Sequence, residues 1–221
     1  MSIKINYKNN IIKKSSKNLI LFVEEGFNIK SLKDYLSNIE FSYINDLLKN
    51  SDLKKDILFF EISSQKKIFL VSVKKNLKNS EIENLGAKFH AYVKHDKNND
   101  YSINSDTISN KKENFVGYFL HGLKLKSYEF DIYKSKKNRS VISINVIGKE
   151  NKISAQNQLR FKALEEGSFF ARDLVSEPGN ILHPDEYAKR INTLKKFGLK
   201  INTYDEKKLK KLGMNALLGV G

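Results

Sequence analysis

The stretch ARDLVSEPGNILHPDEYAKRI, residues 171–191, contains the clearest boundary between structural elements in this chain. Residues 154–176 hold no proline and a single glycine, and their apolar positions recur at helical spacing, so we expect one long helix. Pro178 and Gly179 end that helix, because proline restricts the residue before it and glycine permits a turn. Pro184 then suits the first position of a new helix, and two acidic residues follow it.

The segment after this boundary predicts a helix, a strand, a helix and a second strand. In the first helix Tyr187, Ile191 and Leu194 fall on one face, which we expect to be buried. Residues 199–204 have the pattern of a strand. Residues 214–220 are apolar again, and the last residues, ALLGVG (216–221), read as a strand that enters a sheet. These four elements are too few to close a core of their own. We therefore expect the chain to stop inside a domain.

The first 150 residues predict strands that alternate with helices. Four short apolar runs have the length of strands: 19–23, 57–62, 68–73 and 141–147. Ser80 and Glu83 are spaced as a capping box at the start of one helix, and a second helical pattern begins at Phe115. Residues 96–112 are polar and predict a loop. A sheet covered by helices, an α/β domain, is the expected fold.

Composition narrows the class of protein. Of the 221 residues 40% are hydrophobic, enough for a core, but the longest apolar runs are far too short to span a bilayer. The first residues lack the apolar stretch of a signal peptide. The chain has no cysteine, which excludes disulfides and thiolate metal sites. We expect a cytoplasmic protein without a membrane partner.

The net charge of +15 raises the possibility of nucleic-acid binding. Only four of the 40 basic residues are arginines, so the guanidinium groups suited to phosphate and guanine are scarce. The lysines are spread along the whole chain. This pattern favours a solvated lysine surface, with nucleic-acid binding as the alternative.

Two blocks of sequence resemble the leucyl aminopeptidases of peptidase family M17, which are two-metal cytosolic exopeptidases. The matching positions of the first block are Gly122, Leu123, Tyr128, Phe130, Asp131, Tyr133 and Lys134. Those of the second are Ala171, Arg172, Asp173, Leu174, Pro178, Asn180, Leu182 and Pro184, followed by Gly213, Met214, Leu217, Val220 and Gly221. His183 departs from the hydroxyl residue that many members place before the proline, which weakens the helix cap by about 1 kcal/mol.

The resemblance implies a domain plan and an activity. It implies a macro-domain-like α/β domain over residues 1–150, a linker helix over 151–176 and the start of a truncated catalytic domain over 177–221. The complete enzyme would remove N-terminal residues, preferentially leucine, from peptides and would form a homo-oligomer, a hexamer. Two divalent ions, Mn or Zn, would activate a water molecule. Their ligands would all lie downstream of the matched region.

The resemblance therefore assigns no catalytic, metal-binding or cofactor-binding residue to this chain, and we expect the chain to be inactive by itself. Two other interpretations stay open. One is a free-standing basic module that binds nucleic acid or a nucleotide. The other is an oligomerisation subunit that assembles with a full-length enzyme.

Other possible sites are better explained by structural roles. His90 and His95 lie five residues apart, which does not match the spacing of a helical metal pair, so a surface or helix-end role is expected. His121 should be partly buried in a helix. Residues 117–124 lack the lysine and hydroxyl of a phosphate-binding loop.

The polar residues of the long helix receive the same interpretation. Ser168 lacks the flanking glycine of a nucleophile elbow. Glu165 and Glu166 are neighbours and should lie on a solvated helix surface. Arg172 and Asp173 are expected to form structural salt bridges that hold the helix, because a buried charge needs a partner.

Overall fold

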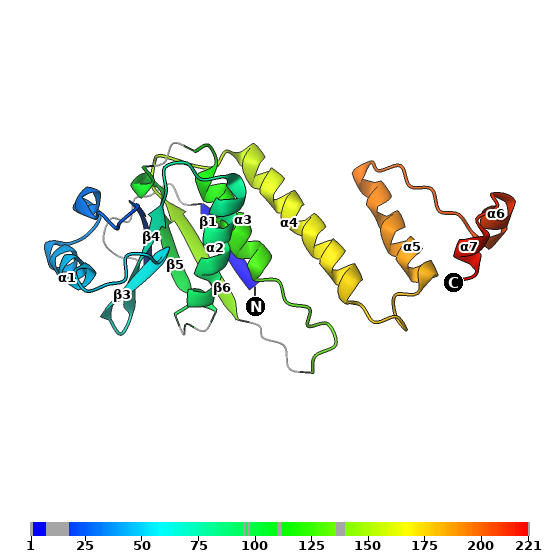
Figure 1. Cartoon of the computed structure of the whole chain (residues 1–221), viewed down its shortest axis with the longest axis horizontal. Coiled ribbons are helices and arrows are strands. Elements are labelled where there is room, and N and C mark those ends of the chain that lie inside the picture. The colour runs from blue at the N-terminus through cyan, green and yellow to red at the C-terminus, as the bar shows by residue number, and fades with distance from the viewer. Residues whose placement is uncertain are drawn as a thin grey trace. The chain divides into compact units, whose positions relative to one another are not determined.

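A computed structural model of the chain describes residues 2–7, 18–94, 96, 98–109, 112–135 and 140–220 (Figure 1). The chain divides into two compact units, Met1–Phe169 and Phe170–Gly221. The boundary between the units falls inside a single long helix. Each unit is described separately below.

The first unit is a six-stranded sheet with helices on its faces, which confirms the α/β prediction. The strands are β1 (Ser2–Tyr7), β2 (Asn18–Glu24), β3 (Ile57–Ser63), β4 (Lys66–Val73), β5 (Asp100–Asn104) and β6 (Val141–Ile147). Their order is β1-β6-β5-β2-β4-β3. All neighbouring pairs are parallel except β3 with β4. The four strands predicted from apolar runs are all present, whereas β1 and β5 were not predicted.

The prediction of a loop over residues 96–112 is wrong. Strand β5 and a short 3-10 helix, η2 (Ser105–Thr107), lie within it. Strand β5 is a central strand between β6 and β2, and it buries Tyr101 and Ile103 in the core. Its polar residues Ser102 and Asn104 are also buried, and Asn104 accepts a hydrogen bond from the N–H of Asp106 at 3.1 Å. The polar sequence of β5 did not indicate a strand. The buried polar side chains find their hydrogen-bond partners only inside the fold.

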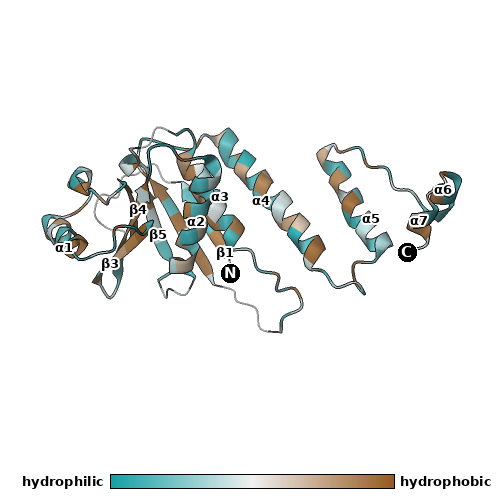
Figure 2. Ribbon diagram, viewed as in Figure 1, coloured by the Kyte–Doolittle hydropathy of each residue, from teal (hydrophilic) through white to brown (hydrophobic). Residues whose placement is uncertain are grey.

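The two faces of the sheet have separate hydrophobic cores because successive strand residues point to opposite faces. On β2, Ile20 and Phe22 pack with helices α2 (Asn79–Val93) and α3 (Phe115–Lys126). Leu19, Leu21 and Val23 of the same strand pack with η1 (Lys30–Leu32) and α1 (Asn38–Leu48). Figure 2 shows the apolar residues concentrated on the strands.

Helices α2 and α3 touch backbone to backbone. A Cβ atom on Gly86 would overlap the carbonyl oxygen of Phe119, and one on Gly122 would overlap the carbonyl oxygen of Glu83. The predicted capping box is displaced by two residues, because α2 starts at Asn79 and Glu81 accepts the N–H of Lys78 at 2.6 Å. Glycine at both contact points allows the helices this close approach.

The long helix predicted before Pro178 is confirmed as α4 (Ala155–Ser176). Phe161 is its buried residue. The Phe161 ring lies 5.1 Å from the ring of Tyr118 and 5.6 Å from the ring of His121, both on α3. Through these contacts the first half of α4 is fixed to the first unit.

The second unit contains the end of α4, α5 (Pro184–Asn192), η3 (Thr193–Phe197), α6 (Glu206–Lys211) and α7 (Asn215–Leu218). Pro184 stands at the start of α5 as predicted, and His183 makes no side-chain cap bond. The prediction that one face of α5 is buried is wrong, because α5 buries none of its residues and Tyr187 is 47% exposed.

Both strands predicted for the second unit are wrong. Residues 199–204 form no strand, and residues 215–218 of the apolar segment 214–220 form α7. A strand needs a neighbour for its backbone groups, and the described part of this unit contains only helices and irregular segments. The apolar segment therefore satisfies its backbone locally as a helical turn. The apolar colouring of α7 is visible in Figure 2.

Candidate functional site

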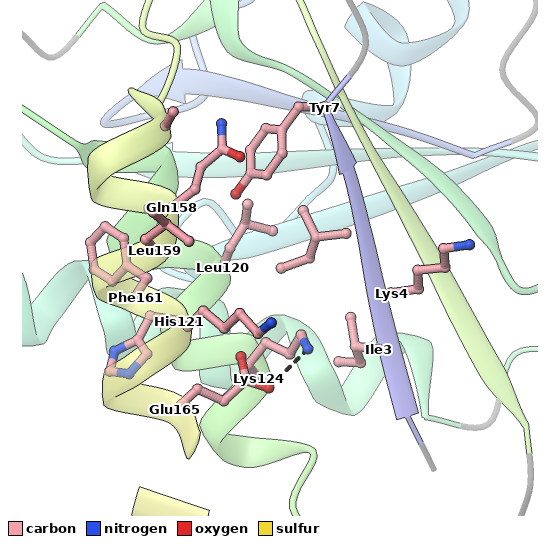
Figure 3. Close-up of a pocket in the computed structure, with 14 residues that line it drawn as sticks. Ile3, Lys4, Tyr7, Leu120, His121, Lys124, Gln158, Leu159, Phe161 and Glu165 are labelled. Carbon is pink, nitrogen blue, oxygen red and sulfur yellow. Dashed lines mark hydrogen bonds and ion pairs between the residues drawn. The ribbon is translucent and has the colours of Figure 1, made fainter. Parts of the chain in front are cut away.

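A pocket of about 610 Å³ lies in the first unit between β1, α3 and the first half of α4. Figure 3 shows β1 on one side of the pocket, α4 on the other and α3 between them. The volume is within the range typical of ligand sites, about 300–1,000 Å³. We take this pocket as the candidate site of the described residues.

The middle of the pocket is apolar. Strand alternation brings Ile3, Ile5 and Tyr7 of β1 to the pocket side. Leu120 of α3 and Leu159 of α4 complete this surface. Leu159 is 69% exposed, so the pocket presents a large apolar side chain to solvent. Such a surface favours a ligand with apolar groups.

An ion pair lies at one end of the pocket. The Nζ atom of Lys124 on α3 is 2.9 Å from Oε1 of Glu165 on α4, and both side chains are 19% exposed. Figure 3 shows this pair near Ile3. The prediction that Glu165 lies on a solvated surface is wrong, because α4 packs on α3 and brings Glu165 to Lys124. Glu166 does lie on the surface, with Lys162 at 3.7 Å.

Neutral polar groups lie at the other end of the pocket, where Figure 3 shows Tyr7 and Gln158 together. Burial raises the pKa of the Tyr7 hydroxyl, so this group is a neutral donor and acceptor at physiological pH. The Gln158 amide donates to the carbonyl of Ile153 at 3.0 Å. The oxygen of this amide can still accept a hydrogen bond.

The histidine predictions are partly confirmed. His121 is buried as predicted, and its Nδ1 lies 2.9 Å from Oε1 of Glu83, a partner that the sequence did not reveal. His90 lies in the last turn of α2, but it is buried and not on the surface. Burial lowers the pKa of His90, and the charge of Lys94 lowers it further. His95 lies outside the described residues.

The described residues do not offer a metal site. Within them, no group of three or more histidine or carboxylate side chains could hold an ion. Residues 117–124 lie inside α3 and Ser168 inside α4, so their predicted helical placement is confirmed, while their structural roles stay a prediction. Arg172 and Asp173 are partly buried on α4, and their role in salt bridges stays a prediction.

One ion pair of the second unit was not predicted. Nη1 of Arg190 lies 2.8 Å from Oε1 of Glu177, whose side chain is 3% exposed, and the Arg190 Nε lies 3.1 Å from Glu186. These bonds fix α5 to the residue that precedes Pro178. Arg190 is thus paired with carboxylates. Nucleic-acid binding, the alternative function, stays a prediction.

Among the helices of the described residues, none combines the length and the apolar character needed to cross a membrane.

Comparisons with known proteins point to one class, the cytosol aminopeptidases. Residues 169–221 match the model of the cytosol aminopeptidase family, catalytic domain, peptidase M17. A probable cytosol aminopeptidase of Nitrobacter winogradskyi is 33% identical over 178 residues, which cover 75% of this chain and 35% of that protein. Another, of Agrobacterium fabrum, is 39% identical over 108 residues, which cover 46% of this chain and 22% of that protein.

Solved structures share the fold. A tomato leucine aminopeptidase variant matches with a TM-score of 0.71 at 17% identity, over 96% of this chain and 46% of that one. A cytosol aminopeptidase from Coxiella burnetii matches with a TM-score of 0.63 at 16% identity, over 94% and 41%. The bottromycin maturation enzyme BotP in complex with Mn gives 0.64 at 15% identity, over 90% and 40%. The chain belongs to the M17 cytosol aminopeptidase family, as an N-terminal part, and its match spans about a third of the length of its Nitrobacter relative.

Proposed function

We propose that this chain supplies the N-terminal unit and the first catalytic-domain elements of a cytoplasmic aminopeptidase that removes N-terminal residues, preferentially leucine, from peptides. The observation that supports this most strongly is the match of residues 169–221 to the catalytic-domain model of the M17 peptidases. The likeness to probable cytosol aminopeptidases extends over 75% of the chain. The cytoplasmic location and the preference for leucine come from the family resemblance.

The complete enzyme would use two divalent ions, Mn or Zn, to activate water and polarise the scissile carbonyl. The residues described here do not fit such ions, since no suitable group of ligands exists among them. We propose that the ligands lie in polypeptide beyond the matched region and that this chain is inactive by itself.

The role of the first unit in this proposal is structural. Its sheet and the Phe161 contacts hold the first half of α4, and α4 continues into the unit that matches the catalytic domain. A further part of the proposal is that the complete enzyme assembles as a hexamer. Sedimentation of the complete protein tests this: a species of six chains is expected, and a monomer at micromolar concentration contradicts it.

A paired activity measurement tests the proposed function. The 221-residue chain and the product of the whole reading frame of its gene are purified and incubated with Mn or Zn and leucyl p-nitroanilide. We expect turnover by the longer product and none by the chain. A glutamyl p-nitroanilide control should be cleaved more slowly, if leucine is preferred.

Three results would each contradict a part of the proposal. Turnover by the 221-residue chain above a blank that contains only metal would overturn its inactivity. A longer product that cleaves neither substrate with either ion would overturn the aminopeptidase assignment. A longer product that cleaves both substrates equally would leave the activity but remove the preference for leucine.

A further inference from the structure

Within the part of the chain that the structure describes, the pocket between β1, α3 and α4 is bordered by an unpaired sheet edge. Strand β1 lies at one end of the strand order, and among the described strands it pairs with β6 alone. Ser2 donates its N–H to the carbonyl of Ser140 at 3.1 Å, so the backbone of Ser2 faces β6. Backbone groups of successive strand residues point to alternate edges. The N–H and C=O groups of Ile3, Ile5 and Tyr7 therefore face away from β6.

The same three residues of β1 contribute their side chains to the pocket, and α4 forms the opposite wall (Figure 3). Two large side chains there are open to solvent, Leu159 at 69% and Tyr7 at 41% exposure. An unpaired strand edge beside an apolar pocket is the arrangement by which sheets bind extended peptides. The edge supplies main-chain hydrogen bonds, and the pocket accepts alternate side chains.

The charged residues of the pocket indicate the direction in which a bound peptide would run. Of the residues that line the pocket, Lys4, Lys124 and Lys162 are basic and Glu165 is the single carboxylate. Lys124 lies at the Ile3 end of the pocket, whereas Tyr7 lies at the other end with Gln158 (Figure 3). An ammonium group has three donors, so Lys124 can keep its bond to Glu165 and bind a second carboxylate. A peptide whose C-terminal carboxylate meets Lys124 would run antiparallel to β1.

We propose that this pocket binds a short extended peptide with apolar side chains, which adds antiparallel to β1 and places its C-terminal carboxylate at Lys124. The edge from Ile3 to Tyr7 spans four residue steps of about 3.4 Å each, or roughly 14 Å, which matches a peptide of four or five residues. The pocket volume of about 610 Å³ suits a ligand of this size. The proposal does not depend on hydrolysis, so its test uses direct binding.

The probe is the peptide Val-Ile-Val-Leu with a fluorophore on its N-terminus, where the dye also blocks aminopeptidases. Fluorescence anisotropy with the 221-residue chain should show saturable binding. The same peptide with a C-terminal amide should bind about tenfold more weakly, because it lacks the charged partner of Lys124. A peptide methylated at alternate amide nitrogens should lose binding, because those nitrogens can no longer pair with the strand edge.

Matched variants locate the site. Lys124→Met should weaken the carboxylate probe about tenfold and leave the amide probe unchanged. Lys126→Met, at an exposed position of the same helix that does not line the pocket, should change neither. Binding should also shift the NMR signals of the backbone amides of Ile3, Ile5 and Tyr7.

Several outcomes would overturn the proposal. The absence of saturable binding up to about 1 mM would do so, because that limit corresponds to only about 4 kcal/mol of binding free energy. Equal binding of all three probes would indicate unspecific adhesion to apolar surface. A probe affinity that falls as the chain concentration rises would show that a second copy of the chain occupies the edge.

Discussion

Replacing Gly122 by alanine should destabilise the first unit by pushing α2 and α3 apart. The added Cβ would lie far inside the contact distance of the Glu83 carbonyl oxygen, which belongs to the backbone of α2 and cannot rotate away. A normal C···O contact is about 3.3 Å or longer, so the two atoms must move apart by roughly 1.4 Å. This shift would also reduce the packing contacts of the core residues that lie between these helices and the sheet.

The magnitude follows from two opposing effects. Alanine in a helix is more favourable than glycine by about 1 kcal/mol. Overpacking costs typically 1–3 kcal/mol, and a backbone contact that cannot relax by rotation places Gly122→Ala at or above the upper end. We expect a net loss of about 2 kcal/mol, which lowers the melting temperature of a chain of this size by about 4–8 °C.

Urea unfolding followed by circular dichroism at pH 7 measures this loss. Gly167→Ala is the matched control, because Gly167 is also helical but a Cβ there has nothing within 4 Å. The control should raise the stability by about 0.5–1 kcal/mol. The double variant with Gly86→Ala should lose less than the sum of its single variants, because one separation of the helices accommodates both methyl groups. The reasoning is refuted if Gly122→Ala and Gly167→Ala shift the midpoint in the same direction.

Three further changes test the buried polar groups and the docking of α4. Burial lowers the pKa of His90 below its ordinary 6.5, so the unfolded chain binds this proton first and stability is lost as the pH falls below 6.5. His90→Leu should flatten the decline in unfolding free energy between about pH 7 and 5, by at most about 1.4 kcal/mol per pH unit, and an unchanged slope contradicts this. Burial raises the pKa of the Asp96 carboxyl, but hydrogen bonds to this carboxylate, including one from Tyr101, outweigh burial and lower the pKa overall. The stability that the charged Asp96 contributes is therefore lost as the pH falls through the folded pKa. Asp96→Asn should therefore cost about 1–3 kcal/mol near neutral pH in urea unfolding, and the deficit should shrink in acid; a constant deficit argues against the charge. Phe161→Ala should cost about 3 kcal/mol in the same measurement through loss of its ring contacts with Tyr118 on α3, and a cost below about 1 kcal/mol means that α4 is held elsewhere.

The parts of the fold that were predictable from sequence are those in which a local pattern determines the structure. Strand β6 is rich in β-branched residues, and α4 keeps its periodicity until Pro178 stops it. Gly198 ends η3 with a φ of 86°, a left-handed conformation that glycine adopts readily. In each case the side chains along one segment carry enough information, so no distant partner has to be known.

The parts that were not predictable depend on distant partners. Strand β5 has a polar sequence, and only its place between β6 and β2 makes it a strand. The segment 214–220 has the apolar sequence pattern of a strand, but within the described residues it has no neighbouring strand to pair with. The bond between Glu83 and His121 joins helices 38 residues apart. The pocket needs β1, α3 and α4 together, so its residues form no motif along the chain.

The pairing of the first strand with the last strand of the sheet has a consequence for synthesis of the protein. Ser2 aligns with Val141, so the sheet cannot be completed until nearly two thirds of the chain has been translated. At about 5–20 residues per second, the first strand waits roughly 7–28 s for its neighbour. During this interval the nascent segment SIKINY is open to the wrong partner. Slow codons before position 141 would lengthen that exposure, and a chaperone that covers the emerging N-terminus would be most useful in this window.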